Sequence, residues 1–157
     1  MLEIKQSKTA DTRSAETKVD KETLLASSHQ HIGDVQLALH WMACRLGEIA
    51  LKHDWTKIDG IDQFFEDFKS VQNDKTIDFK KLPWFNRHVT TERHHVNDHC
   101  PDDVNLFDLL ERIADITMAG MARTGKIYDD TLSPDILAKA YSNTVALLKS
   151  NIIVKGV

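Results

Sequence analysis

The stretch that decides the fold is IGDVQLALHWMACRLGEI, residues 32–49, in which large apolar side chains recur every three or four positions. That spacing places them along one side of an α-helix. The stripe consists of Ile32, Val35, Leu39, Met42, Leu46 and Ile49. We therefore predict a long amphipathic helix, or two abutting ones, over residues 22–53. Gly47 is its weakest point, because glycine in a helix interior costs about 1 kcal/mol relative to alanine.

The rest of the chain also has helical rather than strand patterning. We predict a helix over residues 61–71, helix or helical turns over 84–99, a helix capped by Asp103 or Asn105 that runs to about residue 122, and a last helix from Ser133-Pro134 to about residue 148. No alternating apolar pattern is longer than residues 152–154. The predicted fold is all-α, a compact bundle of about five helices.

The length and net charge of the chain limit its domain organisation and the kinds of partner it can bind. The chain has 157 residues, which fits one domain, here residues 23–157. Residues 1–22 carry five basic and five acidic side chains and few large apolar ones, which predicts a flexible arm. A net charge of −4 predicts no extended nucleic-acid surface, and no apolar run is long enough to span a membrane. The two cysteines cannot form a disulfide framework, so we expect a cytoplasmic protein.

The histidines are the chemically informative residues. His53 is followed directly by Asp54, and this pair offers a neutral nitrogen and a carboxylate oxygen to a divalent cation. The alternative is an ordinary helix end, in which His53 interacts with the last carbonyl groups.

A second cluster lies in WFNRHVTTERHHVNDHC, residues 84–100. On a helix His88, His95 and His99 would share one face, while His94 and Arg93 would point elsewhere. The guanidinium of Arg93 suits a phosphate oxygen. A solvated face is the alternative interpretation of these histidines.

Residues 105–115, NLFDLLERIAD, complete the pattern. A helical wheel puts Leu106, Leu110, Ile113 and Thr117 on the apolar face, and the acidic side chains Asp108, Glu111 and Asp115 on the opposite one. That acidic face is either solvated or the inner wall of a metal site between helices.

A His-Asp pair, a histidine cluster and a later aspartate, in this order and in an all-α chain, resemble the HD-domain metal-dependent phosphohydrolases. The chain is most similar to a small HD-like family of phages and bacteria, with counterparts in residues 53–57 (HDWTK), 92–99 (ERHHVNDH) and 105–115. The likeness covers about residues 31–123. The departures are Glu92, Val96 and Asn97-Asp98, where the family has asparagine, proline and a glutamate-containing pair.

The resemblance implies a metal-dependent phosphohydrolase that uses a metal-activated water on a small phosphate ester, most plausibly a nucleotide. It implies one or two divalent ions (Mn, Fe, Co, Ni or Zn) and, for a phage-encoded chain, the host cytoplasm. The implied metal ligands are His53, Asp54, His88, His94, His95, Asp115 and His31. The implied catalytic residues are Asp54, Lys57 and Arg93, and the implied substrate-binding residues are Lys57, Arg87, Arg93 and Glu111.

His31 raises a geometric problem. It lies 22 residues before His53, or about 33 Å along an unbroken helix, so the two cannot share an ion unless the helix folds back near Gly47. Otherwise His31 serves elsewhere or across a dimer interface. The long apolar stripe of this helix favours a homodimer.

Two non-enzymatic alternatives remain. His94, His95, His99 and Cys100 could form a closed structural zinc site, which leaves no position for water. An HD-like fold without chemistry, for example a phage effector that binds a partner protein, is the other.

Overall fold

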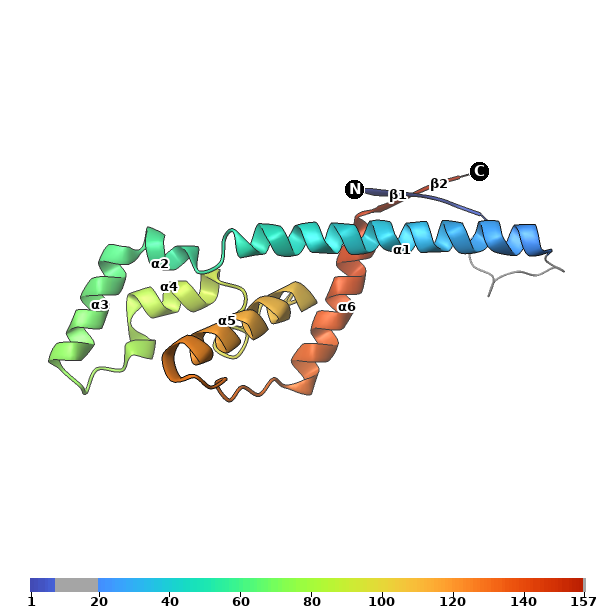
Figure 1. The fold of residues 1–157 in the computed structure, drawn as a ribbon. Helices are drawn as coiled ribbons and strands as arrows, with labels where there is room; N and C mark the ends of the chain where they lie inside the picture. The colour runs from blue at the N-terminus through green and yellow to red at the C-terminus, as the bar shows by residue number, and fades with distance from the viewer. Residues whose placement is uncertain (8–19, 157) are drawn as a thin grey trace. The chain divides into compact units, whose positions relative to one another are not determined.

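The computed structural model describes residues 1–7 and 20–156, and its elements are shown in Figure 1. Five helices have nine or more residues: α1 (Lys21–Ala50), α3 (Ile61–Asn73), α4 (Pro83–Thr91), α5 (Leu106–Thr124) and α6 (Pro134–Ser150). A short helix α2 (Trp55–Asp59) and a 3-10 helix η2 (Phe79–Lys81) connect them. The all-α prediction is confirmed. None of the helices in the described ranges is both long and apolar enough to cross a bilayer.

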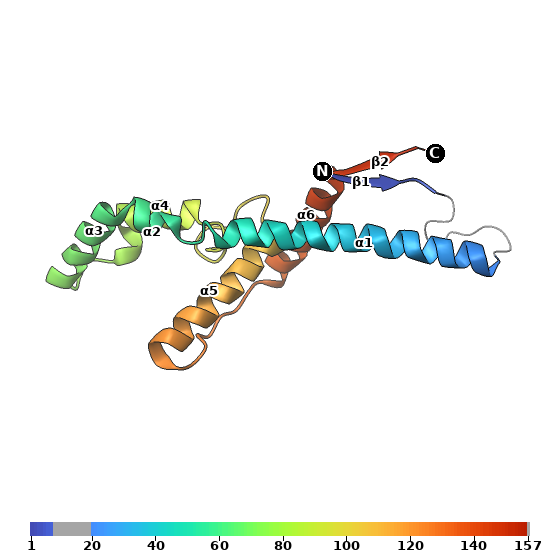
Figure 2. The same cartoon turned by 45° about the horizontal axis from the view of Figure 1, so that its top comes forward.

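The chain divides into two compact units. One consists of residues 1–47 and 145–157, and the other of residues 48–144. The first contains two short strands, β1 (Leu2–Lys5) and β2 (Ile152–Lys155), which pair in parallel with Leu2 opposite Ile152 (Figure 2). Within the segment predicted as a flexible arm, residues 2–5 form strand β1, and residues 8–19 lie outside the described part of the chain.

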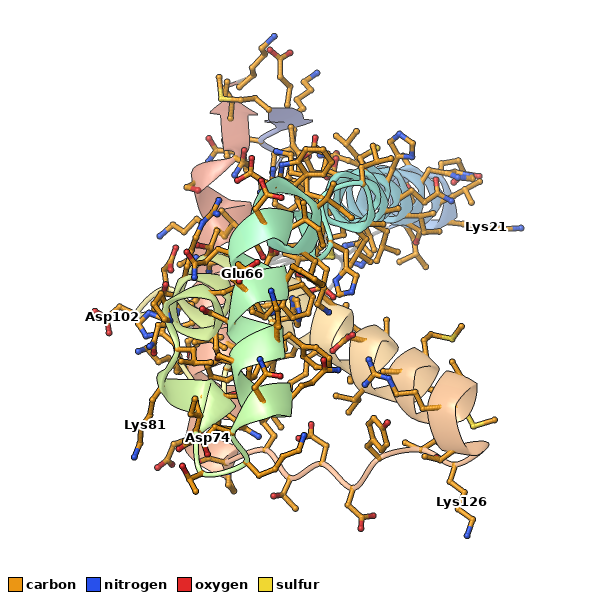
Figure 3. All side chains as sticks on the ribbon, turned by 90° about the vertical axis from the view of Figure 1, so that its left-hand side faces the viewer. Lys21, Glu66, Asp74, Lys81, Asp102 and Lys126 are labelled. Carbon is orange, nitrogen blue, oxygen red and sulfur yellow. The ribbon has the colours of Figure 1, made fainter. Side chains whose placement is uncertain are left out.

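The helix ends follow local chemistry. The Asp20 carboxylate accepts a hydrogen bond from the Thr23 amide at the start of α1. Asn105 caps α5, with Asp108 completing a capping box, and Gly125 ends it at φ 69°, a left-handed conformation that favours glycine. In the second unit Figure 3 shows Glu66 on α3, Asp74 just beyond its end and Lys126 beyond the end of α5.

The second unit has two apolar clusters. In one, the buried Trp84 of α4 stacks on Phe64 of α3, with ring centroids 3.8 Å apart, and the buried Asp67 carboxylate accepts a hydrogen bond from the Trp84 amide. The other consists of Val96, Val104, Leu109 and Ala140, with Leu106, Leu132 and Ile136 packed against it. Together they fix α4 and the segment after it, which carry His88, His94 and His95, and also α5, which carries acidic side chains.

The segment predicted as helix or helical turns over residues 84–99 contains both. Helix α4 ends at Thr91, and turns follow over residues 92–99. The Glu92 carboxylate accepts a hydrogen bond from the Thr56 amide, and Arg112 donates to the His94 carbonyl oxygen. The β-branched residues before Glu92, namely Val89, Thr90 and Thr91, have low helix propensity. Together with the two contacts they favour a turn over a longer helix. The shared helical face predicted for His88, His95 and His99 therefore does not form.

Candidate metal centre

Asp54 occupies an unusual backbone conformation between α1 and α2. Its φ of 56° is the only positive value among the non-glycine residues of the described ranges. Aspartate tolerates this left-handed region better than most residues, but it still costs roughly 1–2 kcal/mol. Although Asp54 precedes α2, its side chain forms no capping hydrogen bond. The conformation instead directs the carboxylate toward the histidines.

Three imidazoles approach the Asp54 carboxylate with their Nε2 atoms. His53 Nε2 lies 3.4 Å from Oδ2, while His88 Nε2 and His94 Nε2 lie 3.5 Å and 3.6 Å from Oδ1. The Nε2 atom of His95 lies 2.9 Å from that of His88. Four ring nitrogens from the α1–α2 turn, α4 and the turn after it thus converge on one carboxylate.

The opposite nitrogens of these rings have partners that favour this orientation. His53 Nδ1 lies 2.9 Å from Glu111 Oε1, and His88 Nδ1 lies 2.6 Å from Thr56 Oγ1. His94 Nδ1 lies 3.1 Å from Glu111 Oε1, off the line of a hydrogen bond, so this contact is electrostatic. A proton held on Nδ1 by a carboxylate leaves the Nε2 lone pair free, which is the usual arrangement around a metal-ligating histidine.

Three buried polar atoms at the centre have no hydrogen-bond partner: Asp54 Oδ1 and both ring nitrogens of His94. Of these, His94 Nε2 lies 3.6 Å from Asp54 Oδ1. Buried polar atoms are nearly always satisfied, because leaving one unpaired costs about 1–3 kcal/mol. When the neutral His94 ring carries its proton on Nδ1, the Nε2 lone pair faces the Asp54 oxygen and the two repel each other. A cation between them would satisfy both. The donor set therefore fits a divalent ion.

The protonation states also suit a cation site. Burial lowers the pKa of His95 to about 4, with further lowering from His94 and His88. Burial likewise lowers the pKa of His88, against the opposing effect of Asp54. Both rings are therefore neutral near pH 7, which is the state that ligates metals.

The acidic partners are ionised. Burial alone would raise the pKa of Asp54, but Lys57 and the neighbouring histidines lower it overall. The pKa of Glu111 is lowered in the same way by His94 and His53, against burial. Burial alone would lower the pKa of His94, but the carboxylates of Glu111, Asp54 and Asp115 outweigh it and raise the value. Acidic oxygens thus dominate the field at the centre.

The ligand atoms form overlapping groups, within each of which they lie no more than 4.8 Å apart. The groups are His53–Asp54–Asp115, Asp54–His88–His95, Asp54–Glu92–His94 and His53–His94–Glu111. Asp54 belongs to three of them, and its two oxygens face different histidines. The predicted ligands His53, Asp54, His88, His94, His95 and Asp115 are therefore brought together. His94 was predicted to point away, but it is buried in the centre, with 1% of its side chain exposed.

His31 stands apart from these ligands. Helix α1 continues through Gly47 without folding back, and His31 is exposed and belongs to none of the ligand groups found in residues 1–7 and 20–156. The same holds for His99 and Cys100, which are both exposed. The ligand set of the structural zinc alternative is therefore not assembled in the described residues.

The predicted phosphate-binding residues make different contacts in the structure. Lys57 forms an ion pair with Asp54 Oδ2, directly at the centre. Arg87 forms an exposed ion pair with Asp59. Arg93 binds both oxygens of the buried Asp108 through Nε and Nη2, at 2.8 Å and 2.9 Å, and also binds Asp103. These donors of Arg93 hold the turn after α4 onto the start of α5.

Of the two alternatives left open for the acidic face of α5, the structure has the inner wall, with Glu111 and Asp115 turned to the histidines. The predicted apolar face was wrong in part: Leu106 packs in the core, but Leu110 and Ile113 are exposed. Asp108 and Glu111 take the inward positions instead. Asp108 is buried and pairs with Arg93, and Glu111 contacts His53 and His94.

Sequence patterns did not reveal two contributors, Thr56 and Glu92. Thr56 lies two residues after Asp54, and its hydroxyl orients His88. Glu92 is buried beside Asp54 and His94. A hydroxyl next to a His-Asp pair was the only local signal for Thr56, and Glu92 was visible only as a departure from the family pattern.

A cavity of about 460 Å³ adjoins the centre. It is lined by Leu51, Lys52, Trp55, Thr56, Thr91 and Glu92. Thr56 and Glu92 also belong to the centre, and the indole of Trp55, whose residue is 60% exposed, follows Asp54 in the chain. The cavity thus places an aromatic surface beside the ligand cluster.

The chain was compared with protein-family models, curated proteins and solved structures, and none of the three comparisons found a match.

Proposed function

We propose that this protein is a metal-dependent phosphohydrolase of the HD type that acts on a small phosphate ester, most plausibly a nucleotide. The observation that carries the proposal is the convergence of four imidazole nitrogens on Asp54, whose buried Oδ1 has no hydrogen-bond partner. Burial keeps His88 and His95 neutral near pH 7. A mixed set of imidazole and carboxylate donors is typical of catalytic divalent cations.

The residues divide into ligands and orienting partners. His53, His88, His94, His95, Asp54 and Asp115 would hold one or two ions, with the two Asp54 oxygens shared between ligand groups. Such ions supply Lewis acidity and lower the pKa of a coordinated water to about 7. Glu111 and Thr56 hold three of the imidazoles by their Nδ1 sides. The Asp115 carboxylate, 3.6 Å from His53 Nε2, would orient the attacking water.

Substrate recognition would rest on Lys57 and the adjoining cavity. Lys57 Nζ pairs with Asp54 Oδ2 and would exchange part of this contact for a phosphate oxygen, neutralising charge that develops during transfer. In the cavity Trp55 offers a flat aromatic surface, and Lys52 and Glu92 offer polar groups at its wall. A phosphate ester with an aromatic base fits this combination better than a purely polar sugar phosphate.

The test begins with the metal content of the purified protein, measured by elemental mass spectrometry. Phosphate or pyrophosphate release is then measured from nucleoside mono-, di- and triphosphates with added Mn²⁺, with EDTA as the control, and ribose 5-phosphate serves as a substrate without a base. We expect bound metal, EDTA-sensitive release and a preference for nucleotides. Metal binding without release from any of these esters would contradict the hydrolase and leave a metal-binding protein.

The role of Glu111 gives a second prediction. Glu111→Gln should lower Mn²⁺ affinity about 10–100-fold, because an amide oxygen no longer attracts the Nδ1 protons of both His53 and His94. Isothermal titration measures the affinity, and the ¹⁵N shifts of the imidazoles report the tautomers. Glu66→Gln, at an exposed position of α3, is the control. Unchanged affinity and tautomers in Glu111→Gln would contradict the orienting role.

A further inference from the structure

In the first unit, residues 1–47 and 145–157, helix α1 exposes apolar side chains and turns polar ones inward. The N-terminal part of its apolar stripe faces out: Leu25, Ile32, Val35 and Leu39 are 56%, 50%, 42% and 58% exposed, whereas Met42 and Leu46 are half-buried. Figure 3 views this helix nearly end-on, with side chains projecting around it.

The inward face of α1 is polar. Ser27 is buried, and Thr23, Gln30 and Asp34 on the same side are partly buried. The Gln30 amide donates a hydrogen bond to the Lys5 carbonyl oxygen of β1, 2.7 Å away. A helix of a monomer normally turns its apolar stripe to the core and its polar side to water, so the exposed stripe requires a cover.

The period of the stripe identifies the kind of cover. Positions 25, 28, 32, 35, 39, 42, 46 and 49 follow alternating steps of three and four without interruption, and all but Ser28 are large and apolar. This is a heptad repeat with an average step of 3.5 residues, sustained over more than three heptads. In a coiled coil, an average step of 3.5 residues keeps the apolar stripe in contact with the partner helix along its whole length. A helix packed against an ordinary core does not require this strict repeat.

The residues that flank the stripe favour an identical partner. The flanking positions are occupied by His29, His31, Gln36, Ala38, Ala43, Arg45 and Ala50, with no acidic residue and one arginine. Two identical flanks of high charge would repel each other, whereas these flanking positions carry almost no charge. Their alanines are small and allow two copies of the helix to approach closely. Within the chain, residues 8–19 contain one large aliphatic residue, Val19, which is too little to match the stripe.

We propose that two copies of the chain associate through α1, by a coiled-coil seam along the stripe from Leu25 to Leu46. Three heptads of contact on each copy bury the four exposed residues Leu25, Ile32, Val35 and Leu39 against their counterparts. The polar stripe with Ser27 and Gln30 stays on the sheet side of each copy. The association is independent of the metal centre, whose ligands all lie in residues 48–144.

The experiment is sedimentation equilibrium of the full chain over a wide concentration range. We expect a mass twice the 17.9 kDa of one chain. In Ile32→Glu/Leu39→Glu the dissociation constant should rise on the order of 1,000-fold, because each seam would have to bury four carboxylates. Leu37→Glu is the matched control, since Leu37 lies two residues from Leu39 but outside the heptad stripe; it should remain dimeric. Far-UV circular dichroism checks the helix content of each variant.

A double alanine variant provides a second test if the double glutamate variant does not fold. Ile32→Ala/Leu39→Ala keeps strong helix formers at both positions and should raise the dissociation constant about 10- to 100-fold. A wild-type chain that stays monomeric at all concentrations would overturn the proposal, and would mean that the rest of the same chain covers the stripe. A dimer whose dissociation constant neither pair changes would also overturn it, because another surface would then hold the copies together.

Discussion

Asp54→Asn is expected to lower Mn²⁺ affinity by more than about 100-fold and to reduce metal-dependent phosphate release to background, with the helix content unchanged. The affinity should fall further than in an orienting variant such as Glu111→Gln, because Asp54 contributes oxygens to three of the four ligand groups. Asparagine has the same shape and tolerates the left-handed φ of 56° equally well, so the substitution removes charge and donor strength without straining the turn.

The measurements for this variant are Mn²⁺ titration, elemental mass spectrometry and phosphate release. Asp59→Asn is the matched control: Asp59 lies in the same short helix α2, but its exposed carboxylate pairs with Arg87 instead of the histidines. We expect the control to keep the metal and the activity of the wild-type protein. An Asp54→Asn protein that retained metal at wild-type affinity would refute the assignment of the centre.

Arg93→Met is expected to destabilise the protein by about 2–3 kcal/mol rather than to act on catalysis directly. It leaves the carboxylate of Asp108, with 4% of its side chain exposed, without its charged partner. Removing one member of a buried ion pair costs about 3–5 kcal/mol, and the partial exposure of Arg93 and the remaining capping bond from the Asn105 amide reduce that figure here. The melting temperature should fall by about 5–10 °C.

Urea and thermal denaturation measure this effect. Arg87→Met is the control, because its exposed ion pair with Asp59 should contribute less than about 1 kcal/mol. The double variant Arg93→Met/Asp108→Asn should recover part of the loss, since it removes the buried charge as well. If Arg93→Met kept wild-type stability but lost phosphate release, Arg93 would instead be a substrate-binding residue.

Local patterns in the sequence predicted the helices well. The period of three and four residues in α1, the Asn105 cap and Gly125 end of α5 and the proline start of α6 are all properties of neighbouring residues. The shared face of Glu111 and Asp115 also follows from their spacing of four, but the spacing left open whether that face meets solvent or the histidines.

The parts that were not predicted depend on contacts between distant residues. His94 turns inward only because the chain leaves the helix at Glu92, and that turn depends on a hydrogen bond to Thr56, 36 positions away. The bidentate pair of Arg93 and Asp108 spans 15 positions. No periodicity encodes such pairings, so Arg93 resembled a phosphate ligand until its partners were visible.

The parallel pairing of β1 and β2 has a consequence for the order of folding. Leu2 and Ile152 are 150 positions apart, and closing a flexible loop of that length costs about 4 kcal/mol in chain entropy. Four paired residues cannot offset that cost while the intervening chain is unfolded, whereas isolated helices form within about a microsecond. The sheet therefore closes after the helices between its strands have formed, and contacts made this late govern how fast the native protein opens, not how fast it forms.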